Sequence, residues 1–444
     1  MRYVIIGGDA AGMSAAMQIK RESSQDDQII TLEKGDYYSY GQCGLPYVIS
    51  GDVQSTDDVI AKPVEVFRQK HGIDARTRHE VTDVNADQQV VSGVDLDNDE
   101  PFELEYDKLL IATGVSPIKP GWDGIDLDGI HSMKTIPDTE KIITDLQSEE
   151  PETVTIVGGG FIGLEIAENM QEIGKHVRII QAGQQLMNPL DYDMAKLLHD
   201  EAEQHGVDLI FNEFVQRFEG DQRVEKVITD QGEYSTDQAI VNIGVKPNTD
   251  FLDPIVFDLN DQGAILVNEF METNVNNVYA AGDCTVDYNR VKKQNDFVPL
   301  GTTANKQGMT AGMNIVGQEK PFQGIVGTSI LQFFTLDVAR TGLSEKEANS
   351  LGFNYDVSTI KTNAVAGYYD QQPLHLKLVY EQGSRKILGG QAIGTYGADK
   401  RIDVLATALY HNMTTIELLD LDLAYAPPYN GVWDPIQQAA KKTL

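Results

Sequence analysis

Cys43 is the side chain in this sequence with the most reactive chemistry to offer. It lies in the run Tyr37-Tyr-Ser-Tyr-Gly-Gln-Cys-Gly-Leu-Pro-Tyr47, and the only other cysteine among 444 residues, Cys284, is far away along the chain. A redox pair of neighbouring cysteines is therefore excluded. A lone thiol must form its disulfide with a molecule outside the chain, or be oxidised to a sulfenic acid. Cys284 follows Gly-Asp without any thiol motif, so we expect it to be structural and inert.

Two nucleotide-binding fingerprints accompany this thiol. The first is Val4-Ile-Ile-Gly-Gly-Asp-Ala-Ala-Gly12, where a short apolar run leads into an Ala-rich one. The second, Val154-Thr-Ile-Val-Gly-Gly-Gly-Phe-Ile-Gly163, is a full G-x-G-x-x-G. Such glycines make a tight turn, let a pyrophosphate approach the backbone, and allow a helix to pack closely on a strand. Two strand-turn-helix fingerprints predict two dinucleotide sites in one chain.

The two fingerprints differ in detail. Asp9 stands at the middle glycine position of the first, so we expect a side chain near the phosphates. Glu33 ends the next apolar run, where an acid can bind ribose hydroxyls. The matching run of the second fingerprint ends at Gln181, which can accept a ribose hydroxyl or tolerate a 2′-phosphate, and Arg178 is expected on the other face. The choice between NADH and NADPH stays open.

The elements that must position these residues follow an α/β pattern. Residues 1–50 read as strand, helix, strand, loop and helix, and residues 60–112 as short alternating strands. Residues 151–244 form a second unit of the same kind. A helix is expected at about 300–316, and strands alternate with helices beyond 322. A chain of this length should hold two or three domains with ample core.

Composition narrows the class of protein further. The 35 basic and 68 acidic residues give a net charge of −33, which disfavours nucleic acid and anionic membranes as partners. We infer a halophilic or halotolerant host as a hypothesis. No apolar run approaches the roughly 18 residues that span a bilayer, and Met1 leads directly into the first strand, so we expect neither membrane span nor signal peptide. Two cysteines and scattered histidines favour a cytoplasmic protein without a metal site.

The motifs together resemble the flavoprotein disulfide reductases with two dinucleotide-binding domains. Within that family the chain is most similar to the coenzyme A disulfide reductase branch, which includes the single-cysteine NADH oxidases and peroxidases. The resemblance covers nearly the whole chain and rests on Gly7–Gly12, Glu33, Ser39–Tyr47, Ala112-Thr-Gly114, Gly158–Gly163 with Leu164-Glu165, Gly282-Asp283, Ala424-Tyr-Ala-Pro-Pro-Tyr429 and Asp434-Pro435.

The resemblance implies an α/β fold with two Rossmann-like dinucleotide-binding domains and a C-terminal α+β dimerisation domain. Residues 1–112 and 245–321 would form a discontinuous FAD-binding domain, residues 113–244 an NAD(P)-binding domain, and residues 322–444 the dimerisation domain of a homodimer.

The implied cofactors are FAD and NAD(P)H. Asp283 would hold the ribityl chain of FAD, and the helix after Pro299 would aim its positive end at the flavin pyrimidine. Glu165 would orient the nicotinamide carboxamide. The implied cofactor-binding residues are Gly7, Gly8, Ala10, Ala11, Gly12, Glu33, Lys34, Ser39, Val81, Ala112, Thr113, Gly114, Gly158, Gly160, Phe161, Ile162, Gly163, Glu165, Gln181, Gly244, Gly282, Asp283, Leu300, Gly301 and Thr303.

The implied reaction is reduction of a low-molecular-weight disulfide such as CoA disulfide. Cys43 would attack one sulfur and form a mixed disulfide with CoA, which supplies the second sulfur. Because Cys43 would start a short helix, with Pro46 in its first turn, we expect the helix dipole to lower its pKa. Gln42 and Ser39 are expected to contact substrate. Gln42 stands where many relatives have asparagine, so contacts to the thiol end of CoA can differ.

A departing thiolate needs a proton, and residues 415–444 contain no His-x4-Glu pair of the ordinary dithiol reductases. Tyrosines stand there instead. The resemblance implies that Tyr425, and one of Tyr368 and Tyr369, reach the partner subunit's active site as catalytic proton or hydrogen-bond donors. Tyr429 is expected to bind substrate. Their alternative role is packing at the interface.

Two other functions stay open. An NAD(P)H oxidase or peroxidase would use Cys43 as a sulfenic acid and reduce O2 or peroxide. A nicotinamide-sensing flavoprotein that acts through a partner would need no reactive thiol. The chain stops at Leu444 without a sulfurtransferase-like extension, which disfavours a persulfide reductase.

Overall fold

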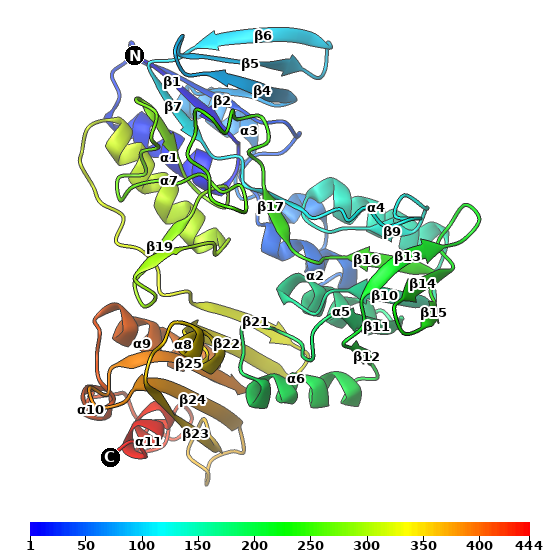
Figure 1. The fold of residues 1–444 in the computed structure, drawn as a ribbon, viewed down its shortest axis with the longest axis vertical. Coiled ribbons are helices and arrows are strands. Elements are labelled where there is room, and N and C mark those ends of the chain that lie inside the picture. Colours follow the sequence, from blue (N-terminus) through cyan, green and yellow to red (C-terminus); the bar gives the residue numbers. More distant parts are fainter.

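The computed structural model describes residues 1–444, and three five-stranded sheets organise them (Figure 1). The first sheet is parallel and has the order β18-β7-β1-β2-β3. Its central strand β1 (Arg2–Ile6) lies between β2 (Gln28–Leu32) and β7 (Lys108–Ile111), with β3 (Asp74–Arg76) and β18 (Val278–Ala280) at the edges. We call this sheet and its helices the first unit.

The second sheet is also parallel, with the order β12-β11-β10-β16-β9. Its central strand β10 (Thr153–Val157) lies between β11 (His176–Gln181) and β16 (Gln238–Val241), and the edges are β12 (Asp208–Phe211) and β9 (Ile130–His131). This second unit also contains α4 (Ile136–Ser148), α5 (Phe161–Glu172) and α6 (Tyr192–Gln204).

The third sheet is antiparallel and forms the C-terminal unit. Its strands, in the order in which they pair, are β21 (Ser329–Phe333), β22 (Leu336–Gly342), β25 (Ile387–Gly394), β24 (Pro373–Glu381) and β23 (Tyr355–Asn363). The unit's helices are α8 (Glu345–Ser350), α9 (Ala398–Tyr410), α10 (Thr415–Leu419) and α11 (Pro435–Lys441).

Smaller sheets complete the nucleotide-binding units. The expected alternating strands between 60 and 112 form one of these, made of β4 (His79–Asn85), β5 (Val90–Asp95) and β6 (Glu100–Glu105). A second contains β13 (Val215–Glu219), β14 (Lys226–Thr229) and β15 (Glu233–Ser235).

The chain passes from the first unit to the second and back through paired strands. β8 (Val115–Pro117) on the outward path pairs antiparallel with β17 (Val245–Pro247) on the return path. This pair lies close to the boundaries predicted at 112/113 and 244/245, which themselves stay a prediction.

In the first unit, α1 (Ala10–Glu22) and α7 (Gly301–Ile315) pack closely together. A Cβ on Gly308 of α7 would lie 2.1 Å from the carbonyl oxygen of Ala11 on α1, so only glycine permits this approach. The close contact brings the N-terminal ends of both helices to the same edge of the first sheet, where its strands end.

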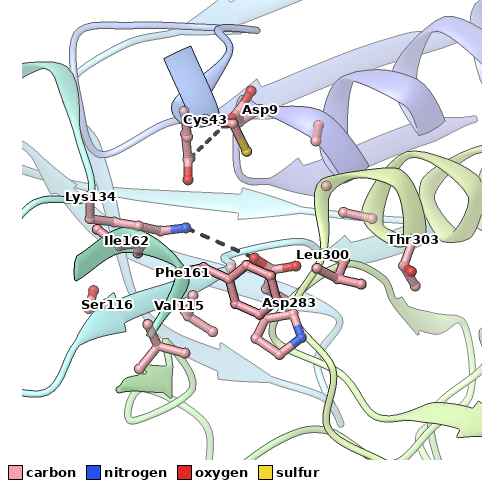
Figure 2. A pocket seen from close by; sticks show the side chains of 18 of the residues that line it. Asp9, Cys43, Val115, Ser116, Lys134, Phe161, Ile162, Asp283, Leu300 and Thr303 are labelled. Carbon is pink, nitrogen blue, oxygen red and sulfur yellow. Dashed lines mark hydrogen bonds and ion pairs between the residues drawn. The ribbon is translucent and has the colours of Figure 1, made fainter. Parts of the chain in front are cut away.

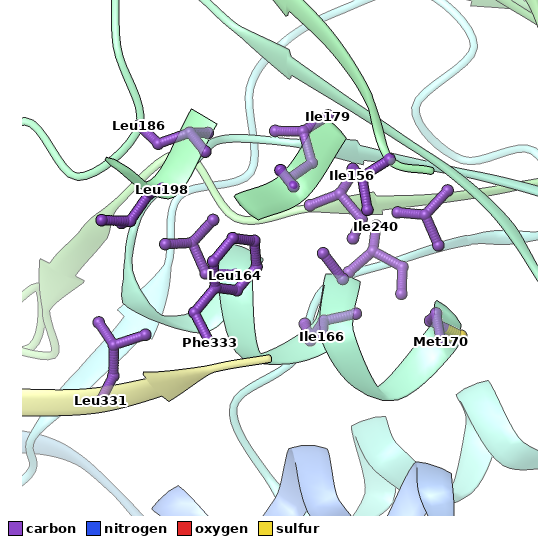
Figure 3. Close-up of a cluster of buried hydrophobic side chains, with 14 of the residues drawn as sticks. Ile156, Leu164, Ile166, Met170, Ile179, Leu186, Leu198, Ile240, Leu331 and Phe333 are labelled. Carbon is purple, nitrogen blue, oxygen red and sulfur yellow. The ribbon is translucent and has the colours of Figure 1, made fainter. Parts of the chain in front are cut away.

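The second unit and the C-terminal unit share one hydrophobic core (Figure 3). Leu331 and Phe333 of β21 pack in the same buried cluster as Leu164 of α5 and Leu198 of α6. Truncating a fully buried leucine such as Leu164 to alanine costs about 2–5 kcal/mol of folding free energy. The shared core holds the second unit firmly on the C-terminal sheet.

The predicted fold class is confirmed, because two parallel dinucleotide-binding sheets precede an α+β C-terminal unit. None of the helices combines the length and apolar character that crossing a bilayer would require.

Candidate functional site

A cavity of about 2790 Å³ opens where the strands of the first and second sheets end, and both fingerprints line it. Figure 2 shows Cys43 and Asp9 on one side of this cavity, and Lys134 reaching across it toward Asp283. The Lys134 Nζ and Asp283 Oδ2 atoms are 4.0 Å apart. This is the carboxyl edge of parallel strands, where α/β sheets bind their ligands.

The first fingerprint has the geometry of a pyrophosphate turn. Gly7 has φ +114°, in the region that favours glycine, and a Cβ on Gly12 would lie 2.0 Å from the Gly7 carbonyl oxygen. Glu33 stabilises the turn from the end of β2, because its two carboxylate oxygens accept from the N–H groups of Gly8 and Gly35, each at 2.8 Å. Burial raises the pKa of Glu33, while these N–H groups act in the opposite direction.

The second fingerprint repeats this geometry. Gly158 has φ +111°, and a Cβ on Gly163 would lie 2.0 Å from the Gly158 carbonyl oxygen. Gln181 Oε1 accepts from the N–H of Gly159 at 2.9 Å. Arg178 points to the other face, as expected, where its guanidinium stacks over the Tyr234 ring at 5.2 Å.

The cavity fits the expected dinucleotides. Added Cβ atoms on Gly114, Gly160 and Gly301 would meet no protein atom within 4 Å, so these backbones face open space. The N-terminus of α7 opens onto the same space through Leu300, Gly301 and Thr303. Backbone N–H groups and glycine surfaces of this kind suit phosphate groups.

Cys43 lies in a single 3-10 turn, Gln42–Gly44, which leads into α2 (Leu45–Ser50). Leu45 at the start of α2 is buried in the core of the second unit, and Ser50 Oγ donates to Asn169 Oδ1 of α5 at 2.6 Å. The turn that carries the thiol thus lies between β2 and β3 of the first unit in sequence but is anchored on the second.

The predicted lowering of the Cys43 pKa is wrong for these surroundings. The thiol is accessible, yet burial by the cavity walls raises its pKa, and the nearby Glu165 carboxylate adds to this. Lys134 acts in the opposite direction. A helix dipole has little effect on this thiol, because α2 spans only six residues and Cys43 precedes it. Burial and the Glu165 charge outweigh so short a helix.

Asp9 makes contacts that the sequence did not predict. It lines the cavity, and its side chain does not cap α1. Instead it accepts from the Tyr40 N–H at 3.2 Å and from Gln42 Nε2 at 2.9 Å. The residue therefore connects the first fingerprint to the turn that holds Cys43.

Glu165 is the acid that we expect to orient the nicotinamide. It lies on α5 and lines the cavity, and burial together with the Glu168 charge raises its pKa to about 7. Glu168 is 4% exposed, and burial raises its pKa to about 7 as well. Both groups titrate near neutral pH.

Most of the predicted cofactor-binding residues line the cavity, including Lys34, Val81, Ala112, Thr113, Phe161, Ile162, Gly244 and Gly282. Gly12 does not line the cavity, because it packs against the Gly7 backbone. Ser39 does not line the cavity either. Its N–H donates to the Gly8 carbonyl at 3.0 Å, so it supports the turn through its backbone.

The predicted tyrosines do not line the cavity of their own chain. The Tyr368 and Tyr425 hydroxyls lie 3.1 Å apart on the surface of the C-terminal unit. Tyr368 is 79% exposed and Tyr429 is 62% exposed. The fully buried Arg401 holds both segments, because it donates to the carbonyls of Ala364 and Tyr429.

Sequence reasoning missed Lys134. It lies between β9 and α4, outside any motif, and only the folded chain brings it opposite Cys43 and Asp283. From the sequence, Asp9 is evident only as a replacement of the middle glycine of the fingerprint. Its contact with Gln42 could have been suggested by the fact that Gln42, too, replaces a residue that is common in relatives.

One further group of carboxylates gathers closely, namely Asp191, Asp193 and Glu345. The Lys377 ammonium lies among them, 3.3 Å from Asp191 and 2.7 Å from Asp193, and also contacts Glu345. A lysine thus supplies the cation, and the cluster ties the second unit to the C-terminal sheet.

Comparison with known proteins identifies the family to which the chain belongs. The family model described as pyridine nucleotide-disulphide oxidoreductase matches residues 1–308, and the model of that family's dimerisation domain matches residues 328–435. The chain is 38% identical to the NAD(P)H sulfur oxidoreductase (CoA-dependent) of Pyrococcus abyssi, over 99% of this chain and 97% of that one. It is 32% identical to the coenzyme A disulfide reductase of Staphylococcus aureus, over 99% of each.

A solved structure agrees. The reduced CoADR-RHD of Bacillus anthracis superposes with a TM-score of 0.96 at 34% identity, over 99% of this chain and 79% of that one. The Pyrococcus abyssi relative matches along its length, so chain length does not separate a sulfur reductase from a disulfide reductase. Family models, relatives and fold agree that this chain is a member of the pyridine nucleotide-disulphide oxidoreductase family, whose enzymes use FAD and NAD(P)H.

Proposed function

We propose that this protein reduces CoA disulfide, or a closely related CoA-linked sulfur compound, with NAD(P)H, through FAD and Cys43. The observation that carries the proposal is the position of Cys43. It is the accessible thiol in a cavity lined by both nucleotide fingerprints, whereas Cys284 is fully buried in the core of the first unit. A substrate must therefore bring the second sulfur.

The two halves of the cavity would bind different cofactors. Gly7, Gly8 and Gly12, with Glu33 and Asp283, would hold FAD, and Gly158–Gly163 with Gln181 would hold the nicotinamide nucleotide. Glu165 would orient the nicotinamide. When bound, FAD supplies two-electron transfer between the nicotinamide and a sulfur centre.

Cys43 carries the sulfur chemistry. Its thiolate attacks one sulfur of CoA disulfide, the S–S bond breaks, and one CoA departs as a thiolate that takes up a proton. The mixed disulfide of Cys43 with CoA then accepts two electrons that originate in NAD(P)H, and one proton. This releases the second CoA thiol and restores the Cys43 thiolate. Each cycle consumes one NAD(P)H and one proton.

We assign proton delivery to the tyrosine pair of the other subunit. The Tyr368 and Tyr425 hydroxyls are in mutual contact and exposed, and they lie outside their own chain's cavity. This supports a homodimer in which residues 322–444 of one chain complete the site of the other. Tyr429 and Gln42 would contact CoA. A reducing cytoplasm would keep Cys43 available.

The decisive assay measures turnover of NADH and of NADPH with CoA disulfide, inorganic polysulfide, O2 and peroxide as separate acceptors. We expect the CoA-linked acceptors to give the highest kcat/KM. Cys43→Ser should abolish this activity while NAD(P)H still reduces the bound flavin. Cys284→Ser is the matched control and should change neither reaction by more than about twofold. Equal loss of both half-reactions in Cys43→Ser would reject the proposal.

A second candidate is an oxidase or peroxidase that uses a Cys43 sulfenic acid. It is favoured by the 32% identity with the NADH oxidase of Methanocaldococcus jannaschii, over 100% of this chain and 99% of that one. In that case O2 or peroxide would exceed CoA disulfide in kcat/KM. Trapping of Cys43–SOH with dimedone after exposure to peroxide would accompany it.

The cross-subunit assignment has its own test. Tyr425→Phe should slow disulfide turnover by about tenfold or more, because a proton donor is lost, while flavin reduction stays near wild type. Mixing Tyr425→Phe chains with Cys43→Ser chains should restore activity, since a heterodimer then contains one intact site. If subunit exchange is verified and no activity returns, the tyrosines belong to interface packing.

A further inference from the structure

Asp9 occupies a position that a glycine fills in the second fingerprint. Its backbone is extended, with φ −114°, and the matching Gly160 has φ −89°, so neither position demands glycine for its conformation. The space around Gly160 is open, with no protein atom within 4 Å of an added Cβ. Neither middle position is packed against the protein backbone in the way that Gly12 and Gly163 are.

The Asp9 carboxylate accepts hydrogen bonds from the loop that carries the Cys43 thiol. Its Oδ1 accepts from the Tyr40 N–H at 3.2 Å, and its Oδ2 accepts from Gln42 Nε2 at 2.9 Å. Gln42 and Cys43 are adjacent in one 3-10 turn, and both line the cavity. Figure 2 shows Asp9 and Cys43 on the same side of that cavity.

The chemistry of this contact is directional. An ionised carboxylate only accepts hydrogen bonds, whereas a carboxamide has a donor end and an acceptor end. Facing Asp9, Gln42 must present its NH2 group, and its carbonyl oxygen is left for another partner. Nε2 is the atom through which the Gln42 side chain bonds to the protein.

We propose that Asp9 is a positioning residue, which fixes the orientation of the Gln42 carboxamide so that a hydrogen-bond acceptor faces the low-molecular-weight thiol bound at Cys43. The acceptor would bind the S–H of the released thiol and amide N–H groups of the arm that carries it. This inference rests on the proposed function and deepens it. It also explains why the two departures, Asp9 and Gln42, occur together: the longer glutamine reaches the acid.

Ionisation of Asp9 should control this arrangement. Burial raises its pKa to about 6, and Glu33 acts in the same direction, while the bonds from Tyr40 and Gln42 and the charge of Lys134 oppose it. The carboxylate therefore predominates above about pH 6. Below that pH the acid carries a proton that can be donated to the Gln42 carbonyl, and the carboxamide is free to turn.

Asp9→Asn tests the proposal with little change in shape. The asparagine carbonyl can still accept from the Tyr40 N–H, but its NH2 group then faces Gln42, which must reverse and present a donor to the cavity. We expect KM for CoA disulfide to rise about tenfold, the value of one reversed hydrogen bond. FAD content and the rate of flavin reduction by NAD(P)H should stay within about twofold.

The double variant Asp9→Asn with Gln42→Glu is the sharper arm. The asparagine NH2 can donate to one oxygen of the new glutamate, whose other oxygen again offers an acceptor to the cavity. In this variant the KM for CoA disulfide should return most of the way to the wild-type value. Asp52→Asn is the matched control, because it removes an exposed charge just after α2 without touching Asp9 or Gln42. It should behave as wild type.

A substrate-independent readout separates this inference from the proposed function. The rate at which iodoacetamide alkylates Cys43 should show a step near pH 6 in the wild type, where Asp9 titrates, and lose it in Asp9→Asn. Buried Cys284 contributes no background. If wild type ignores CoA disulfide but shows this step, only the proposed function fails. An unchanged alkylation profile, or an unchanged KM in Asp9→Asn with active enzyme, overturns the inference.

Discussion

In the first unit β1 lies between β7 and β2, and in the second unit β10 lies between β16 and β11, in the same parallel arrangement. The glycines agree closely as well. Gly7 and Gly158 have φ values of +114° and +111°, and added Cβ atoms on Gly12 and Gly163 would each lie 2.0 Å from a carbonyl oxygen. The chain thus builds one backbone turn twice.

The side chains around the two turns differ. Glu33 uses one carboxylate oxygen on the Gly8 N–H of the first turn and the other on the Gly35 N–H beyond β2, whereas Gln181 gives one oxygen to the second turn and keeps an NH2 group. Asp9 replaces Gly160 and turns toward the thiol loop. Glycine is therefore needed where backbones meet, while the middle position and the strand end carry different side chains in the two units.

The largest expected effect comes from adding a methyl group at the third glycine of each turn. Gly12→Ala and Gly163→Ala both drive a Cβ into a backbone oxygen, which cannot move aside as a side chain would. We expect Gly12→Ala to lower the FAD content of the purified protein by about tenfold or more. Gly163→Ala should retain FAD but raise KM for NAD(P)H by a similar factor.

Flavin absorbance and stopped-flow reduction distinguish the two variants. Gly160→Ala is the control, because its methyl group meets no protein atom within 4 Å. It should fold with full FAD content. If Gly163→Ala also loses FAD, the two turns are not independent sites, and the comparison fails.

Exchanging the strand-end residues should give a smaller effect. Glu33→Gln keeps a carbonyl for one N–H group but loses the second acceptor, so FAD affinity should fall about tenfold. Gln181→Glu keeps the bond to Gly159 and adds a charge that repels a 2′-phosphate, so the ratio of kcat/KM for NADH to that for NADPH should rise about tenfold. Steady-state kinetics with both nucleotides measures this. An unchanged ratio would show that Gln181 does not face the ribose.

The smallest expected effect is the pH dependence that Glu165 of the second unit gives to flavin reduction. Burial raises the Glu165 pKa to about 7, so its carboxylate, the better acceptor for a nicotinamide NH2 group, predominates only above that pH. Flavin reduction should therefore rise about fivefold as the pH increases through 7, the worth of one hydrogen bond. Glu165→Gln should flatten this profile. Stopped-flow absorbance between pH 5.5 and 8.5 measures it, and a falling profile would contradict the sign.

The fold could be predicted from the sequence because the motifs that identify it are short and contiguous. Each fingerprint places strand, turn and helix within about ten residues of sequence, and the steric reason for Gly12 and Gly163 is present in the spacing itself. The expected helix at about 300–316 is α7, and the strands and helices expected beyond 322 are those of the C-terminal unit.

The electrostatics of the site could not be predicted in this way. The Cys43 pKa depends on burial by the cavity walls and then on Glu165 and Lys134, which come from other elements and are brought near only by folding. The partner of Asp9 is likewise more than thirty residues away in sequence. The pairing of Tyr368 with Tyr425 depends on the loops that Arg401 joins, and sequence left Tyr368 and Tyr369 equivalent.

The pairing of β18 with β7 has a consequence for how the chain folds during synthesis. The first sheet needs residues Val278–Ala280 beside Lys108–Ile111, so the whole second unit emerges from the ribosome before that edge can be covered. At about 5–20 residues per second the delay is roughly ten to thirty seconds. During it, the apolar edge of β7 is open to pairing with other chains. The second unit's strands are contiguous from Ile130 to Val241, so its sheet can form while the first unit waits for its last strand.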